Sequence, residues 1–196
     1  GHVKETLWLY LVLMQKLLGS PDLARSALDP CQKNFGPYAK KCSENIMVKA
    51  FDSSSHMRTL NIFRSFSFGG SHFNKNNHFA YDNFIKNKMF NRDIKLNSKG
   101  DSIRNYMHPI DLSNWILLAL KFRKINIINT GSNKNYSIFS LANKIAKYKF
   151  LDLAEVKVKL GRTAKKENYI PNLNKSKKLG LISKLSIDMQ IKDSLR

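Results

Sequence analysis

A short run of the chain, from Arg104 to Asp111, contains an arginine, a histidine and an aspartate, three side chains that can bind ligands or transfer protons. The guanidinium of Arg104 is a planar fork of N–H donors that matches phosphate oxygens two at a time. A solvated surface arginine, or an ion pair between Arg104 and Asp111, would explain the same residue. His108 precedes Pro109, where a histidine most often caps or packs a helix, and Asp111 falls in the first turn, where the dipole favours a carboxylate. Arg104 stands on a predicted strand beside a Gly-Asp turn, and its residue type alone leaves the ligand contact and the structural roles open.

The composition sets limits on the kind of protein that carries this run. The chain has 196 residues, 34 Lys and Arg against 14 Asp and Glu, and a formal net charge of +20. Its 42% of hydrophobic residues can close a core, so a globular fold is expected. The lysines are scattered from Lys4 to Lys192, without a basic tract, and the richness in Lys, Asn and Ile matches AT-rich codons. A basic nucleic-acid-binding module is therefore the least favoured hypothesis.

Cysteine usage and hydropathy indicate the compartment. Cys31 and Cys42 are too few for a disulfide scaffold, and neither stands in a metal-ligand spacing, so we expect no metal and a cytoplasmic location. The longest apolar run, Leu7–Met14, is far shorter than the roughly 20 residues that span a bilayer. It predicts a buried strand in preference to a signal peptide, and no membrane partner is expected.

The elements that must position these side chains alternate between strands and helices. Apolar runs predict strands at Leu7–Met14, Arg58–Phe68, Arg92–Leu96, Arg104–Met107, Ile125–Thr130 and Val156–Leu160. Capping residues and helical periodicity predict helices at Tyr38–Phe51, Asn76–Met89, Pro109–Phe122, Ser137–Tyr148, Asn174–Leu179 and from Ser186 onward. A loop is predicted over Gly19–Gly36, which contains two prolines. The alternation indicates an α/β fold.

Several segments, in one order, resemble the extended short-chain dehydrogenase/reductase family, specifically its NAD-dependent nucleotide-sugar epimerases and dehydratases. Lys99–Leu112 (KGDSIRNYMHPIDL) resembles the family stretch GDGxxxRxYxHxxDL. The other matching segments are Phe63–Gly70, Ile125–Ser132, Ser137–Ala146, Tyr169–Pro171 and Lys177–Gly180. An ordered series is much more specific than one short motif.

The resemblance implies an incomplete Rossmann-type parallel sheet followed by a small α/β substrate-binding domain. Residues 1–68 would be the C-terminal part of the NAD-binding domain, and residues 69–196 would bind the nucleotide sugar. Residues 104–132 are candidates for a return to the Rossmann sheet. The family commonly forms dimers through the helix that carries its catalytic tyrosine and lysine, so a homodimer is among the expected partners.

The resemblance also implies roles for particular residues. Arg104 would bind the diphosphate of the substrate, with Asn83 and His108 as further substrate contacts. For Asn83, a plain polar helix face is an equally good interpretation. Arg64, at the end of its strand, would contact NAD together with a lysine of the preceding helix.

The chain departs from the family pattern where the chemistry is done. The family uses Tyr-x-x-x-Lys, in which the tyrosine is the acid/base and the lysine lowers its pKa and holds the NAD ribose. Here Cys42 stands four residues after Tyr38, and Lys41 stands three after it. The alternative register uses Lys40 and places Gly36 where the tyrosine belongs. A deletion, another register and a sequence error all remain open, with Tyr38 and Lys41 as the first choice for the catalytic pair.

The cofactor loop is a second departure. No GxxGxxG cluster follows an N-terminal strand. No hydroxyl stands at the position of the family's serine or threonine, and Ser20 is the nearest candidate. A glycine turn before a helix N-terminus is what cradles the NAD pyrophosphate. The leading hypothesis is therefore a truncated or divergent NAD-dependent epimerase/dehydratase acting on a nucleotide-diphosphate sugar, in sugar-nucleotide or surface-polysaccharide biosynthesis. A non-catalytic remnant or binding module of the same fold is the alternative.

Overall fold

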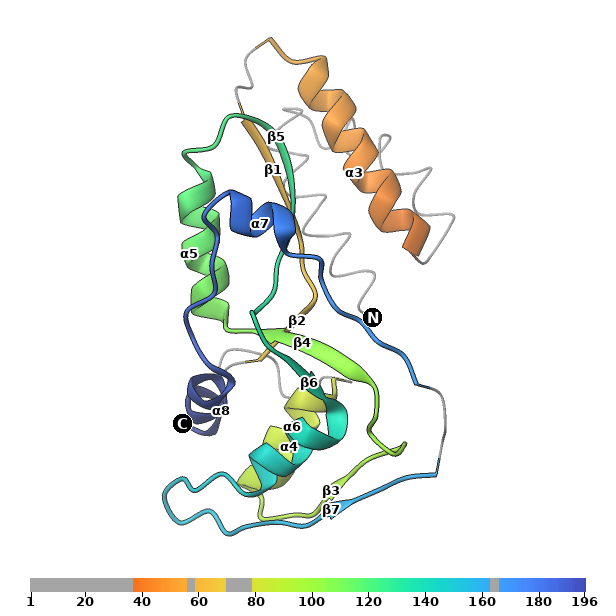
Figure 1. Ribbon diagram of the computed structural model, residues 1–196, viewed down its shortest axis with the longest axis vertical. Coiled ribbons are helices and arrows are strands. Elements are labelled where there is room, and N and C mark those ends of the chain that lie inside the picture. The colour runs from red at the N-terminus through yellow and green to blue at the C-terminus, as the bar shows by residue number, and fades with distance from the viewer. Residues whose placement is uncertain (1–36, 56–58, 70–78, 163–165) are drawn as a thin grey trace. The chain divides into compact units, whose positions relative to one another are not determined.

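The computed structural model describes residues 37–55, 59–69, 79–162 and 166–196, and they form an α/β fold (Figure 1). The chain divides into two compact units. The first contains the described residues up to Ile62 together with Phe122–Asn126, and the second contains Phe63–Lys121 and Ile127–Arg196, apart from the stretches that are not described. The predicted strand at Leu7–Met14 and loop at Gly19–Gly36 lie outside the described residues.

The first unit contains helix α3 (Pro37–Asp52), which confirms the predicted helix within a residue or two at each end. Pro37 suits the first helical position because its φ is fixed and its missing N–H would have no helical partner. Strand β1 (Thr59–Arg64) buries Leu60 and Ile62 and pairs with β5 (Lys124–Asn129). The side-chain amide of Asn126 donates to Asn61 Oδ1 at 3.0 Å, so a polar bridge joins the two strands.

The second unit is built around a small sheet in the order β2-β4-β6, formed by β2 (Ser67–Phe68), β4 (Ile103–Met107) and β6 (Asn135–Ser137). Strand β2 runs parallel to β4, and β6 runs antiparallel to it. A separate parallel pair joins β3 (Ile94–Lys95) to β7 (Val158–Lys159). On β4, Arg104 pairs with Tyr136 of β6 on one side and forms an isolated parallel bridge with Tyr169 on the other. Strand β2 pairs further along β4, at Tyr106 and Met107.

Two predictions about strands were wrong in detail. The single strand predicted at Arg58–Phe68 is interrupted at Ser65 and Phe66, so it forms β1 and β2 in different sheets. Strand β6 was not predicted because its Asn-Tyr-Ser sequence has no apolar alternation. Its pairing with β4 supplies the backbone hydrogen bonds that local sequence does not indicate.

The helices of the second unit are α4 (Ala80–Met89), α5 (Pro109–Ala119), α6 (Ile138–Ala146), α7 (Asn174–Lys178) and α8 (Ile187–Leu195). Ser137 and Ser186 cap α6 and α8 by accepting backbone N–H groups. Helix α5 was predicted to reach Phe122 but ends at Ala119, because the amides of Leu120 and Lys121 bond to carbonyls three residues earlier. Gly180, at φ +74°, follows α7 as predicted.

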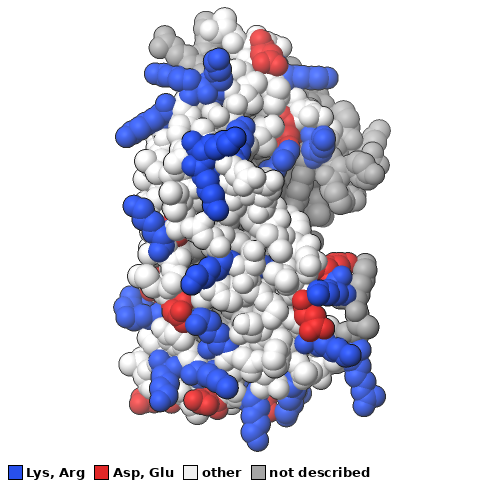
Figure 2. All heavy atoms as spheres, in the orientation of Figure 1, with Lys and Arg blue, Asp and Glu red and all other residues white. Residues whose placement is uncertain are grey.

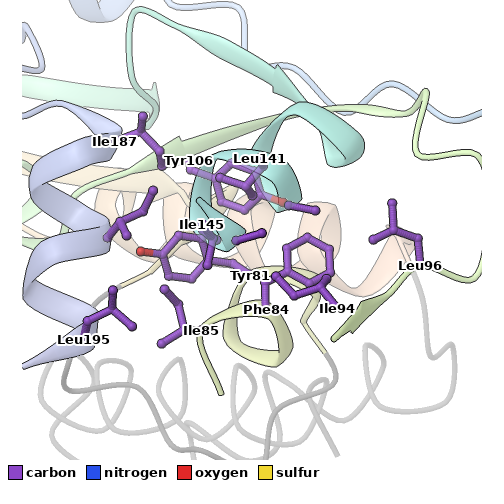
Figure 3. Packing of buried hydrophobic residues seen from close by; sticks show 13 residues of the cluster. Tyr81, Phe84, Ile85, Ile94, Leu96, Tyr106, Leu141, Ile145, Ile187 and Leu195 are labelled. Carbon is purple, nitrogen blue, oxygen red and sulfur yellow. The ribbon is translucent and has the colours of Figure 1, made fainter. Parts of the chain in front are cut away.

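The core of the second unit lies between α4, α6 and α8 and the adjoining face of β4 (Figure 3). Tyr81 and Phe84 of α4 and Leu141 and Ile145 of α6 are at most 3% exposed. Tyr106 brings β4 into this cluster, with its ring centroid 5.7 Å from that of Tyr81. The strand that carries Arg104 is therefore anchored to the core two residues later.

Candidate functional site

Arg104 is half-buried on the central strand β4, and one edge of its guanidinium is held by the protein. Its Nη1 donates to the carbonyl oxygen of Ile103 at 3.1 Å and to that of Glu167. Among the described residues, no hydrogen bond or ion pair engages its Nε or Nη2 groups. The other donors of the fork are therefore oriented and available to a ligand.

The segment that holds this edge runs alongside β4. The amide of Tyr169 donates to the Ile103 carbonyl at 3.0 Å, and Asn168 Oδ1 accepts the Ile103 amide at 3.1 Å. The Tyr169 ring packs against Phe66, with centroids 4.5 Å apart. Sequence reasoning assigned no role to Glu167, whose contribution is a main-chain carbonyl that any residue could supply.

Asn105 is a buried polar residue that sequence reasoning missed. Its amide nitrogen donates to the carbonyl of Ser132 at 2.8 Å and to Asn135 Oδ1 at 2.8 Å, and its Oδ1 accepts the Ser132 amide at 2.7 Å. These bonds tie the turn between β5 and β6 to β4. Gly131 in that turn has no room for a side chain, because a Cβ there would lie 2.7 Å from the Asn105 oxygen. Its position on a predicted strand, between Arg104 and Tyr106, was the sequence feature that could have indicated this role.

His108 uses both ring nitrogens within the protein and is only 4% exposed. Its Nδ1 accepts the backbone amide of Ile110 at 3.2 Å, which caps α5. Its Nε2 lies 3.1 Å from Asp193 Oδ2 on α8. Because Nδ1 accepts a hydrogen bond, the proton must be on Nε2, which donates to the Asp193 carboxylate. The structure places His108 as a clamp between α5 and α8.

Asp111 is 2% exposed and does not pair with Arg104. Its Oδ2 accepts the backbone amides of Lys184 and Leu185 at 3.0 and 2.9 Å. These charge-assisted bonds fix the segment before α8 to the first turn of α5. The ion pair considered from the sequence is therefore replaced by a structural role for Asp111.

The remaining predicted ligand contacts are dispersed. Asn83 is exposed on α4, and among the described residues no contact joins its side chain to Arg104 or His108. Arg64 has an exposed side chain, while its carbonyl accepts the amide and hydroxyl of Thr130 at 3.0 and 3.3 Å. Arg64 thus joins the ends of β1 and β5 through its backbone.

The predicted catalytic residues all fall on α3 in the first unit. Tyr38 and Lys41 are three residues apart on this helix, so their positions are neighbours on its surface. Lys41 is exposed. Lys40 lies between them in sequence, and Gly36 and Ser20 lie outside the described residues.

The pKa of Tyr106, two residues after Arg104 on β4, shows whether this tyrosine can act as a base. Burial raises the pKa of Tyr106, while the charge of Arg104 acts in the opposite direction. Tyr106 therefore keeps its proton at neutral pH and does not supply a base.

In the described part of the chain, no cluster of three or more His, Cys, Asp or Glu could hold a metal ion. No helix in these residues is long and apolar enough to cross a bilayer.

Comparison with known proteins identifies the fold. No family model and no curated protein matches the chain. Solved structures do match: the UDP-glucose 4-epimerase of Thermotoga maritima, with UDP-glucose, has a TM-score of 0.65 and 18% identity, covering 81% of this chain and 51% of that one. The UDP-N-acetylglucosamine 4-epimerase of Methanobrevibacter ruminantium has a TM-score of 0.66 and 16% identity, covering 82% and 53%.

A third match is the UDP-glucuronic acid 4-epimerase of Bacillus cereus in complex with UDP-glucuronic acid and NAD, at a TM-score of 0.61 and 17% identity. It covers 81% of this chain and 50% of that one. The chain thus spans about half the length of the structures it matches. Over about four-fifths of its own length, the chain has the fold of these UDP-sugar epimerases.

Proposed function

We propose that the chain binds a nucleotide-diphosphate sugar, with the diphosphate on Arg104, as part of an NAD-dependent epimerase or dehydratase. The observation that supports this proposal is the Arg104 guanidinium. Two carbonyls hold its Nη1, and no described group occupies Nε or Nη2. A fork oriented in this way loses less side-chain entropy on binding and suits two phosphate oxygens at once.

The other site residues have smaller proposed roles. Asn83, exposed on α4, would contact the nucleotide sugar. His108 would act on substrate only indirectly, by fixing the start of α5, because both of its nitrogens are engaged. Tyr38 would be the acid/base, with Lys41, or in the other register Lys40, stabilising its ionised form.

NAD is the proposed cofactor of the complete fold and would supply the hydride chemistry. On this chain Lys41 and Arg64 would contact it. The glycines present do not form the turn that a dinucleotide pyrophosphate requires, since no GxxGxxG cluster occurs in the 196 residues. The residues of this chain therefore do not form a complete NAD-binding site, and we assign no redox step to this chain alone.

A second candidate function is a binding module of the same fold that performs no catalysis. The altered spacing of Tyr38 and Lys41 and the absence of a glycine cluster favour it. In either case we propose a role in sugar-nucleotide or surface-polysaccharide biosynthesis in the cytoplasm. A homodimer through α3 belongs to the same proposal.

Calorimetric titration of the whole chain with UDP tests the binding proposal. We expect saturable binding at one site, at least tenfold weaker in Arg104→Gln, because a lost bidentate charge-assisted contact costs about 1.5–3 kcal/mol. Lys178→Gln removes an equal charge from an exposed position on α7 and should leave the affinity unchanged. Absence of UDP binding by the wild-type chain, or equal affinity in Arg104→Gln, would overturn the proposal.

Titration with NAD separates the two candidates. Saturable binding, with reduction of the bound cofactor on addition of UDP-glucose, supports the catalytic function. UDP binding without NAD binding supports the binding module.

A further inference from the structure

A cavity in the second unit lies between the end of α4 and the β3–β7 pair, and Arg104 is not among its lining residues. Its volume is about 580 Å³, which is within the usual range for a small-molecule site. The lining residues are Asn87, Asn91, Arg92, Asp93, Lys95 and Lys159. Lys and Arg side chains gather along the lower edge of the surface in Figure 2, where Figure 1 places β3 and β7.

The cavity contains two lysines held side by side. Lys95 and Lys159 are direct partners in the parallel register of β3 and β7. Neighbouring strands lie only about 4.8 Å apart, and like charges directly opposite one another destabilise a sheet. One carboxylate lies near them: Asp93 Oδ2 is 2.7 Å from Lys159 Nζ. Lys95 has no ion pair among the described residues.

The rest of the lining supplies hydrogen-bond donors. Arg92 places its guanidinium carbon 5.3 Å from the centre of the Phe90 ring and makes no ion pair with the described residues. Asn91, at φ +50°, uses its Oδ1 to accept the Ala154 amide at 3.1 Å, which leaves its NH₂ group for a ligand. Asp93 is already engaged, since its Oδ1 accepts the Lys157 amide at 3.2 Å.

These groups have the chemistry of an anion site. Three cations and one carboxylate line the cavity, so its wall carries a net charge of about +2 when Asp93 is ionised. The Lys159 bond and the Lys157 amide hold the pKa of Asp93 below its usual range, which keeps it ionised and bonded to Lys159. Arg92 and Lys95 remain without a counter-charge among the described residues. An anion bound by Arg92 and Lys95 would supply the missing counter-charge and would weaken the repulsion between Lys95 and Lys159.

We propose that this cavity binds a small phosphate compound with at least two negative charges, such as a diphosphate, at a site separate from Arg104. Arg92 supplies a planar fork for phosphate oxygens and Lys95 a point charge. Asn87 and Asn91 provide neutral donors from α4 and the turn after it. A volume of about 580 Å³ accommodates a compact anion such as pyrophosphate.

The test uses the full chain and inorganic pyrophosphate at 150 mM NaCl, where a Debye length of about 8 Å screens diffuse surface charge. Arg104→Gln is the background, so that the proposed sugar-nucleotide site does not contribute. We expect one pyrophosphate per chain in this background, at least tenfold weaker when Arg92→Gln and Lys95→Gln are added. The matched control, Lys177→Gln with Lys178→Gln, removes the same charge from α7 and should leave affinity unchanged.

Thermal unfolding provides a second measurement. Pyrophosphate should raise the melting temperature of the background chain and the control, and should not raise that of the Arg92→Gln/Lys95→Gln chain. Without ligand, Lys95→Gln should melt at the same temperature as the parent or slightly higher, because a repulsion is removed. Three results would each overturn the proposal. They are a loss of affinity in Lys177→Gln/Lys178→Gln equal to that in Arg92→Gln/Lys95→Gln, an unchanged affinity in Arg92→Gln/Lys95→Gln, and no binding of pyrophosphate by the background chain. Because UDP also carries a diphosphate, its binding at Arg104 is measured in the Arg92→Gln/Lys95→Gln chain, so that failure at Arg104 is distinguishable from failure at the cavity.

Discussion

Helices α5 and α6 are both rich in apolar residues, yet the structure treats them differently. In α6, Leu141, Ala142 and Ile145 are fully buried against α4. In α5, Trp115 is 2% exposed, while Leu117 and Leu118 on the same turn are 62% and 44% exposed. The two helices show that apolar content alone does not decide burial.

The difference lies in the pattern of each helix. The buried residues of α6 recur at positions four apart, and polar Ser140, Asn143 and Lys144 occupy the other side. Such a stripe directs one face to the core. Helix α5 is apolar around most of its circumference, so its pattern selects no face. The cap at His108 and the anchor at Asp111 fix its N-terminus, and the buried face continues from Asp111 through Trp115 to Ala119.

The largest change in the free energy of unfolding should come from shortening a buried apolar side chain of α6. Leu141→Ala removes a fully buried side chain and should lower the free energy of unfolding by about 3 kcal/mol, through lost burial and the cavity left behind. Urea unfolding followed by circular dichroism measures it. Leu117→Ala makes the same chemical change on α5 and should cost less than about 0.5 kcal/mol. Equal losses in the two variants would contradict the contrast.

The anchor of α5 should give the next largest effect. Asp111→Ala leaves the amides of Lys184 and Leu185 without their acceptor and should lower the free energy of unfolding by about 2 kcal/mol. Asp111→Asn keeps a neutral acceptor oxygen and should retain part of that stability. The same urea assay measures both. If Asp111→Ala unfolds at the wild-type midpoint, the two bonds do not hold this segment.

A smaller effect, the pH dependence of the free energy of unfolding, should come from the buried phenol of Tyr106. Burial raises the pKa of Tyr106 above the ordinary value of about 10. Above pH 10 the unfolded tyrosine therefore loses its proton first, and stability falls as pH rises, by up to about 1.4 kcal/mol per pH unit. Tyr106→Phe should remove this contribution, so that its free energy of unfolding falls less between pH 10 and 11. A wild-type slope in Tyr106→Phe would show that the phenol is not kept neutral.

The sequence predicted the elements better than it predicted the site. Helices with clear caps, such as α6 after Ser137, were placed within two residues, because capping and periodicity are local. Strand β6 and the roles of Asn105 and Glu167 were missed, since they depend on partners distant in the chain. Arg104 was selected correctly as a strand residue beside a turn, but the carbonyls that orient it could not be read from its neighbours. Whether it binds diphosphate is still a prediction.

The smallest expected effect completes the comparison of α5 with α6. Leu117→Gln exchanges an exposed apolar side chain for a polar one of similar helix propensity, so the free energy of unfolding should change by no more than about 0.5 kcal/mol. The urea midpoint, measured beside that of Ile145→Gln, checks it, because Ile145 is fully buried in α6 and its replacement should unfold the chain or nearly so. A loss above about 1 kcal/mol in Leu117→Gln would mean that the outward face of α5 is covered in solution. The two helices would then differ in what covers their apolar faces, and not in their residue patterns.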